Sequence, residues 1–252
     1  MLELRYKRIV FVYYSIHNVI SFARINLIFG YGSSLWQWYY VHMKLYLSSY
    51  RLPAPNELSE LVGKPLKHIK FALIPNAKDY YANQARNIKI GAYVSYFKKL
   101  GIESDIVDLR DLHNAKEVET KLENYDVIWA AGGNTFCLRY EMKRSGFDNA
   151  LVRLLEKGIV YAGDSAGAIV AGPKIGGLGI EAADTPEFAE SVISEGLDLI
   201  PYIIIPHADS PFFTEITKEI RDKAKPLKVI ELGDSQAVIF NDTKHRVVSG
   251  EK

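Results

Sequence analysis

The segment Ile159-Val160-Tyr161-Ala162-Gly163-Asp164-Ser165-Ala166-Gly167-Ala168 joins a short apolar run to a turn built from small residues. The run predicts a buried strand at 159–162, and the residues through Val170 predict a helix directly after the turn. A G-x-S-x-G pattern between a strand and a helix is typical of a nucleophile elbow, a strained turn that holds a serine hydroxyl over a sheet edge. Ser165 is therefore a candidate nucleophile, and the Ala166 amide a candidate oxyanion donor. The alternative is a tight turn whose serine has no chemical role.

Short apolar runs alternate with helical patterns on both sides of this segment. Further strands are predicted at 45–49, 69–74, 105–109, 126–131, 202–206 and 228–232. Helices are predicted at 55–62, 81–100, 115–122, 135–143, 148–157 and 214–225. This alternation predicts an α/β domain with a mostly parallel sheet and helices on both faces. Ligands of such folds bind at the carboxyl ends of the strands.

The composition is that of an ordinary globular protein. The 252 residues are 48% hydrophobic and 24% charged, which excludes a disordered chain and a polytopic membrane protein. A formal net charge of +1 gives no electrostatic case for nucleic acid as a partner. The single cysteine, Cys137, excludes an intrachain disulfide and a cysteine-rich zinc site. A reducing, cytoplasmic setting is the expectation that follows.

Residues 1–42 differ from the rest of the chain. They hold 11 of the 30 aromatic residues, and four basic side chains against one acidic. The uncharged stretches 9–23 and 25–41 are each shorter than the roughly 20 apolar residues that span a bilayer. A signal peptide and an interfacial anchor are alternative interpretations. We favour Met43 as the true start, with no membrane role, and predict a single α/β domain over 43–252.

A second glycine-rich turn, Gly132-Gly133-Asn134-Thr135, follows the predicted strand 126–131. Adjacent glycines let the backbone approach a ligand closely, and the following helix presents free amides. Gly133 is therefore a candidate second oxyanion donor, and Asn134 a candidate substrate-binding residue. A plain strand-to-helix turn and a phosphate cradle are the alternatives, although the Walker pattern is missing.

A nucleophilic serine needs a base, and the base needs an orienting group. Among the six histidines, His207 alone directly follows an apolar predicted strand, 202–206, which puts it at the functional edge of the sheet. The acids considered as its partner are Glu195, Asp198, Asp209 and Asp234. Asp234 is favoured because it follows the strand 228–232, although spacing alone does not select it.

Three motifs in chain order resemble one family. They are Gly132-Gly133-Asn134-Thr135-Phe136-x-Leu138, Gly163-x-Ser165-Ala166-Gly167-Ala168 and Pro206-His207. Together they are similar to the aspartyl dipeptidase (dipeptidase E) family of serine peptidases, of which cyanophycinase is a relative. The resemblance extends over about 210 residues, from Met43 to the end. It implies a fold like that of class I glutamine amidotransferases, with a serine in place of their cysteine.

The resemblance also implies roles for single residues. Ser165 would be the nucleophile, His207 the base and Asp234 the third member, with oxyanion amides from Gly133 and Ala166. Asp234 departs from the family, which has a glutamate there. The loop after His207 is shorter than in the dipeptidase and lacks its arginine, so a requirement for N-terminal aspartate is not expected.

The predicted function is therefore a serine-type peptidase that cleaves short peptides through an acyl-enzyme, without a metal or organic cofactor. A small peptide is the expected partner, and a homodimer is compatible with the sequence. The alternatives are another amide or isopeptide hydrolase on the same scaffold and a binding protein that has lost catalysis.

Overall fold

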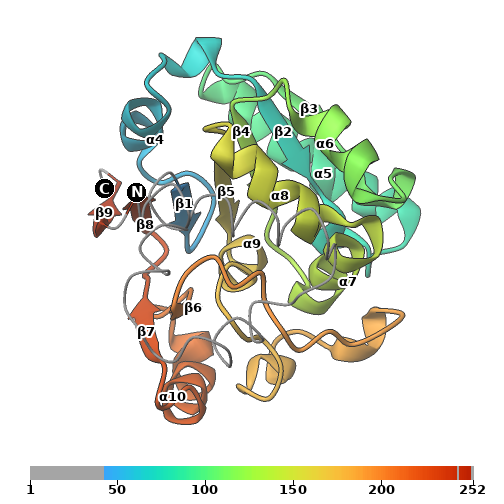
Figure 1. The fold of residues 1–252 in the computed structure, drawn as a ribbon. Coiled ribbons are helices and arrows are strands. Elements are labelled where there is room, and N and C mark those ends of the chain that lie inside the picture. The colour runs from blue at the N-terminus through green and yellow to red at the C-terminus, as the bar shows by residue number, and fades with distance from the viewer. Residues whose placement is uncertain (1–42, 243, 251–252) are drawn as a thin grey trace, which may run out of the picture. The chain divides into compact units, whose positions relative to one another are not determined.

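The structure is a computed structural model and describes residues 43–242 and 244–250. A seven-stranded sheet forms the centre of this part of the chain (Figure 1). The strand order is β3-β2-β4-β5-β1-β8-β9. The strands are β1 (Lys44–Ser48), β2 (Phe71–Ile74), β3 (Ser104–Ile106), β4 (Val127–Ala130), β5 (Val160–Asp164), β8 (Gln236–Asn241) and β9 (Lys244–Ser249). The first five in this order pair in parallel, and β8 and β9 add antiparallel pairs at one side. The predictions about 1–42 lie outside the described residues.

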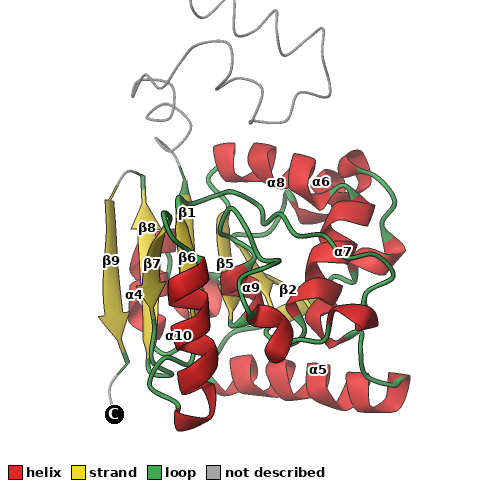
Figure 2. Cartoon of the chain, turned by 90° about the horizontal axis from the view of Figure 1, so that it is seen from below, coloured by secondary structure: helices red, strands yellow, loops and turns green. Residues whose placement is uncertain are grey.

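Helices cover both faces of this sheet. They are α4 (Pro55–Val62), α5 (Asn83–Lys99), α6 (Ala115–Leu122), α7 (Thr135–Ser145), α8 (Phe147–Glu156) and α9 (Ala166–Ile169), whereas α10 (Thr214–Lys223) packs on a second, smaller sheet. One face packs Phe71 and Trp129 against Leu58 of α4 and Phe97 of α5. Helices α6, α7 and α8 lie on the side opposite α5 (Figure 2). Every residue of β2, β4 and β5 is buried, as expected for strands covered on both faces, and the predicted fold class is confirmed.

A second, two-stranded parallel sheet pairs β6 (Tyr202–Ile205) with β7 (Lys228–Glu231). Both strands are predicted by the sequence, but they pair with each other and not with the large sheet. They have their own apolar core, in which Ile203 and Ile205 meet Ile169 of α9 and Ile220 of α10. The sequence does not predict β8 and β9, which extend the large sheet beyond β1.

The predicted strand 105–109 is the element that departs most from expectation. Strand β3 covers Ser104–Ile106 at the sheet edge, and a 3₁₀ turn occupies Leu109–Asp111. The carboxylate of Asp108 accepts a hydrogen bond from the Arg110 amide and so caps this turn. A local side-chain cap of this kind competes with strand pairing.

The register of the sheet brings several strand ends together. Ser48 pairs with Asp164, and Ala130 pairs with Gly163, so β1, β4 and β5 end at one level. Residues that follow these strands therefore gather at one edge of the sheet. No helix in 43–242 or 244–250 has the length and apolar character needed to cross a bilayer.

Candidate active site

Ser165 lies in a strained turn between β5 and α9. Its φ of 50° and ψ of −111° are unusual for a residue other than glycine, and such backbone costs about 1–3 kcal/mol. The turn is held by neighbours, because the Ser165 amide donates to the Ser48 carbonyl at 3.1 Å. Gly167 is required there, since a Cβ on it would lie 2.1 Å from the Ala130 oxygen. The large sheet therefore fixes the direction of the Ser165 side chain.

His207 lies between Ser165 and Asp234. Its Nε2 atom is 3.1 Å from Ser165 Oγ, and its Nδ1 atom is 2.5 Å from Asp234 Oδ1. The imidazole stacks on the Phe213 ring, with 5.1 Å between centroids and 27° between planes. The structure thus brings together the three side chains that the sequence singles out, in the order serine, imidazole, carboxylate. Asp234 is half-exposed, whereas His207 is largely covered.

Ser49, which sequence reasoning misses, connects two of these residues. Its buried hydroxyl accepts a hydrogen bond from the His207 amide at 2.7 Å and donates one to Asp234 Oδ1 at 3.0 Å. The only sequence signal is its position directly after β1, at the sheet edge where the other residues gather. Asp209, considered as a partner of His207, instead accepts a hydrogen bond from the Asp234 amide at 2.9 Å.

The two candidate oxyanion donors are backbone amides near Ser165. Gly133 has φ 145°, and a Cβ on it would lie 2.2 Å from the Ala77 oxygen, so no other residue fits. Neither the Gly133 amide nor the Ala166 amide donates a hydrogen bond to another residue of the described part. Gly133 and Ser165 line the same cavity. Both amides stay candidates for the oxyanion donors that the sequence predicts, and of the two residues only Gly133 lines the cavity among the described residues.

Asn134 has a structural task. Its side-chain oxygen accepts from the Cys137 amide at 2.9 Å and caps α7, and its Nδ2 donates to the Thr185 oxygen at 2.9 Å. The side chain is buried. Its contact with a substrate stays a prediction, while its observed contacts join α7 to the loop around Thr185.

Asp164, the residue before Ser165, is a second polar residue that the sequence analysis misses. Its buried carboxylate accepts hydrogen bonds from Tyr93 Oη at 2.7 Å, Trp129 Nε1 at 3.0 Å and the Gly132 amide at 3.2 Å. Burial raises the pKa of Tyr93 well above its ordinary value, and the charge of Asp164 adds to this effect. Asp164 therefore connects the Gly132-Gly133 turn to the turn that begins at Ser165.

A cavity of about 230 Å³ opens beside Ser165 and His207. Most of its wall is apolar, and one carboxylate, that of Asp184, lines it. The Thr135 amide donates to Asp184 Oδ2 at 2.9 Å, and the Thr135 hydroxyl donates to the same oxygen. Burial raises the pKa of Asp184, although the hydrogen bonds from Thr135 oppose this. Asp184 lies in a segment without periodic pattern, which gave the sequence analysis no signal.

Two other features do not share this chemistry. Cys137 is buried, and burial raises the pKa of its thiol to about 12, so it is a packed side chain and not a reactive one.

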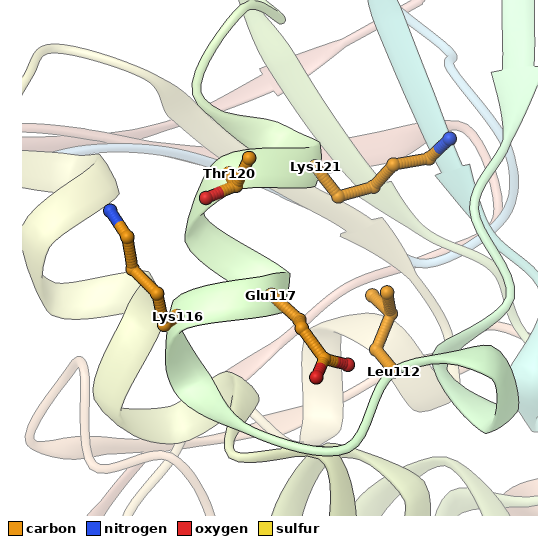
Figure 3. A pocket seen from close by; sticks show the side chains of 5 residues that line it. All are labelled: Leu112, Lys116, Glu117, Thr120 and Lys121. Carbon is orange, nitrogen blue, oxygen red and sulfur yellow. The ribbon is translucent and has the colours of Figure 1, made fainter.

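A hollow of about 410 Å³ along α6 is lined by Leu112, Lys116, Glu117, Thr120 and Lys121 (Figure 3). These side chains belong to one helix and the segment before it, and they include no serine, cysteine or histidine. Among residues 43–242 and 244–250, no three His, Cys, Asp or Glu side chains cluster to hold a metal ion.

Known proteins resemble this chain in sequence and in fold. An uncharacterized peptidase of Listeria innocua, Lin0382, is 29% identical over 188 residues, which cover 73% of this chain and 84% of the relative. Peptidase E of Streptomyces coelicolor is 31% identical over 105 residues, covering 42% of this chain and 41% of the relative.

A crystal structure of a proposed peptidase E protein from Listeria monocytogenes superposes with a TM-score of 0.70 at 24% identity. It covers 83% of this chain and 99% of that one, so the two share a fold. The sequence profile described as Peptidase family S51 matches residues 45–248, which include every residue of the site described above. The chain therefore belongs to peptidase family S51.

Proposed function

We propose that this peptidase is of the serine type and hydrolyses short peptides through an acyl-enzyme. The observation that carries the proposal is the position of His207, 3.1 Å from Ser165 Oγ on one side and 2.5 Å from Asp234 on the other. These distances are within hydrogen-bond reach, as proton transfer from a serine requires. Family membership supports the cleavage of peptide bonds.

The proposed reaction begins when His207 Nε2 accepts the Ser165 proton as Oγ attacks the peptide carbonyl. The amides of Gly133 and Ala166 hold the oxyanion, and Asp234 stabilises the imidazolium. The imidazolium then gives its proton to the leaving amine, and the C–N bond breaks. Water, deprotonated by His207, attacks the acyl-enzyme and releases the acid with Ser165 restored.

The size of the cavity supports short substrates. About 230 Å³ accommodates one side chain and its backbone, and it is smaller than usual drug-sized ligand pockets. We therefore expect di- and tripeptides rather than folded proteins. A panel that includes isopeptides and non-peptide amides distinguishes this function from other amide hydrolysis on the same scaffold.

Labelling with a fluorophosphonate probe tests the proposal. Mass spectrometry should locate the label on Ser165, and Ser165→Ala should abolish both labelling and peptide hydrolysis at nearly unchanged melting temperature. His207→Ala should abolish labelling as well. Ser59→Ala on α4, a helix outside the cavity, is the matched control and should behave as wild type. Hydrolysis by a folded Ser165→Ala protein would overturn the assignment.

A further inference from the structure

Most of the wall of the cavity beside Ser165 is apolar, and five isoleucines belong to it. Its walls include Ile169, Ile180, Ile205, Ile216, Ile220 and Phe213. The buried Thr217 adds a hydroxyl that has no hydrogen-bond partner among the described residues, and it adds no charge. No lysine or arginine lines the cavity. A carboxylate side chain entering it would lose its hydration without gaining a cation, which is costly. An aliphatic side chain would instead gain from burial.

Asp184 is the one acidic residue of the cavity wall. Thr135 holds one of its oxygens by two hydrogen bonds, while Oδ1 accepts none from the described residues. Lys78 and His207 act on this carboxylate through space, but neither forms an ion pair with it. Burial raises its pKa, as expected for a carboxylate without a cationic partner. A cation in the cavity would supply that partner.

The position of Asp184 relative to the oxyanion loop suggests which cation this is. Thr135, which holds Asp184, follows Gly133 by two residues, and Gly133, Asp184 and Ser165 line the same cavity. In a peptide with a free N-terminus, the α-ammonium is attached to the carbon next to the first carbonyl. The side chain of the first residue is attached to the same carbon. When the carbonyl is bound at the Gly133 amide, the ammonium and the side chain therefore both lie close to that carbonyl.

We propose that the cavity binds an uncharged, aliphatic N-terminal residue, with its side chain among the isoleucines and its α-ammonium on Asp184. This specificity rests on the proposed function, since it requires Ser165 to attack the first peptide bond. The substrates would be short peptides with a free amino terminus and an N-terminal residue such as leucine. N-terminal aspartate would be a poor substrate, because its carboxylate would be close to Asp184 and no lysine or arginine lines the cavity.

Three peptides and three proteins test the proposal. The peptides are Leu-Ala, Asp-Ala and N-acetyl-Leu-Ala, and the proteins are wild type, Asp184→Asn and Asp222→Asn. Asp222 is an exposed carboxylate of α10, the helix that supplies Ile216 and Ile220, and is the matched control. Wild type should cleave Leu-Ala with kcat/KM at least about tenfold above both other peptides, as expected for one charge-assisted contact.

Asp184→Asn should lower kcat/KM for Leu-Ala by about tenfold or more, mainly through KM, because a neutral amide no longer pairs with the ammonium. It should lower the rate on N-acetyl-Leu-Ala much less than that on Leu-Ala, since the acetylated peptide has no ammonium. Asp222→Asn should match wild type on all three peptides. Equal or faster cleavage of Asp-Ala by wild type would overturn the aliphatic subsite. An equal loss on Leu-Ala and its acetylated form in Asp184→Asn would overturn the ammonium contact.

Fluorophosphonate labelling of Ser165 separates this inference from the function beneath it. Labelling together with a preference for Asp-Ala would contradict only the inference. Absence of both labelling and hydrolysis in folded wild type would contradict the two together. If Asp184→Asn does not fold, the comparison of the three peptides on wild type still decides the matter.

Discussion

The amide of Asp234 donates a 2.9 Å hydrogen bond to the carboxylate of Asp209, two residues beyond His207. The loop that carries the proposed base therefore also holds the backbone of the proposed acid. Gly233 allows this contact, since a Cβ on it would lie 2.6 Å from Asp209 Oδ2.

Two substitutions of Asp209 should distinguish its role as a hydrogen-bond acceptor from the effect of its negative charge. Asp209→Asn keeps an oxygen for the Asp234 amide and should retain most of kcat, whereas Asp209→Ala should lower kcat about tenfold with KM little changed. Steady-state kinetics on one dipeptide measure both. Equal activity of the two variants would show that the contact does not position Asp234.

Ser49 should act through the residues that it connects. Ser49→Ala leaves the His207 amide without its partner and removes one donor from Asp234, so we expect kcat to fall about tenfold at nearly constant KM. Ser48→Ala, at the last residue of β1, is the control, because the Ser48 hydroxyl bonds the Arg51 and Gly163 carbonyls instead. Equal kinetic effects of both substitutions would argue against a positioning role.

The backbone strain at Ser165 should be measurable as stability. Glycine adopts positive φ without a Cβ penalty, so Ser165→Gly should unfold at a higher temperature than Ser165→Ala. We expect its free energy of unfolding to be about 1 kcal/mol larger. Both variants should be inactive. Thermal melts followed by circular dichroism provide the comparison, and a Gly variant no more stable than the Ala variant would contradict strain at this position.

The raised pKa of Asp184 predicts a pH dependence. Between the ordinary pKa of about 3.8 and the raised folded value, the folded state binds more protons than the unfolded state. The free energy of unfolding contributed by Asp184 therefore falls as pH rises through this window. Asp184→Asn lacks this titration, so its stability relative to wild type should increase in urea melts as pH rises above about 4. A constant difference across this range would contradict it.

Cys137 should not react in the folded protein. Its thiol is buried and its pKa is raised to about 12, so iodoacetamide should modify it only after denaturation. Peptide mapping before and after addition of guanidinium measures this. Rapid alkylation of the native protein, with loss of hydrolysis, would make the thiol a participant in the reaction.

The features that the sequence predicts are those determined by short, continuous segments of the chain. The Ser165 turn occupies five consecutive residues between a strand and a helix, and His207 directly follows an apolar run, so both can be found locally. Among four possible acids, the place after the strand 228–232 favours Asp234, and its contact with His207 selects it. Ser49 and Asp164 reach the site through the register of β1, β4 and β5, which local patterns do not encode.

The same limit applies to the sheets. Apolar runs predict that 202–206 and 228–232 are strands, but not that they leave the large sheet and pair with each other. Strand partners are chosen by contacts between distant residues. Asp184 was missed for a related reason, because it lies in the long connection between α9 and β6, where no periodicity marks a residue as facing a cavity.

The contact between Ser165 and His207 depends on the packing of the two sheets against each other. Ser165 is carried by the large sheet, while His207 follows β6 and Asp234 lies in the connection from β7 to β8. The isoleucine-rich core around Ile203, Ile205 and Ile220 holds these parts in contact. Mild heating that loosens this small core would separate imidazole from serine while most backbone structure persists. Loss of turnover would then be an early indicator that the sheets have come apart, ahead of the unfolding of the helices that cover the large sheet.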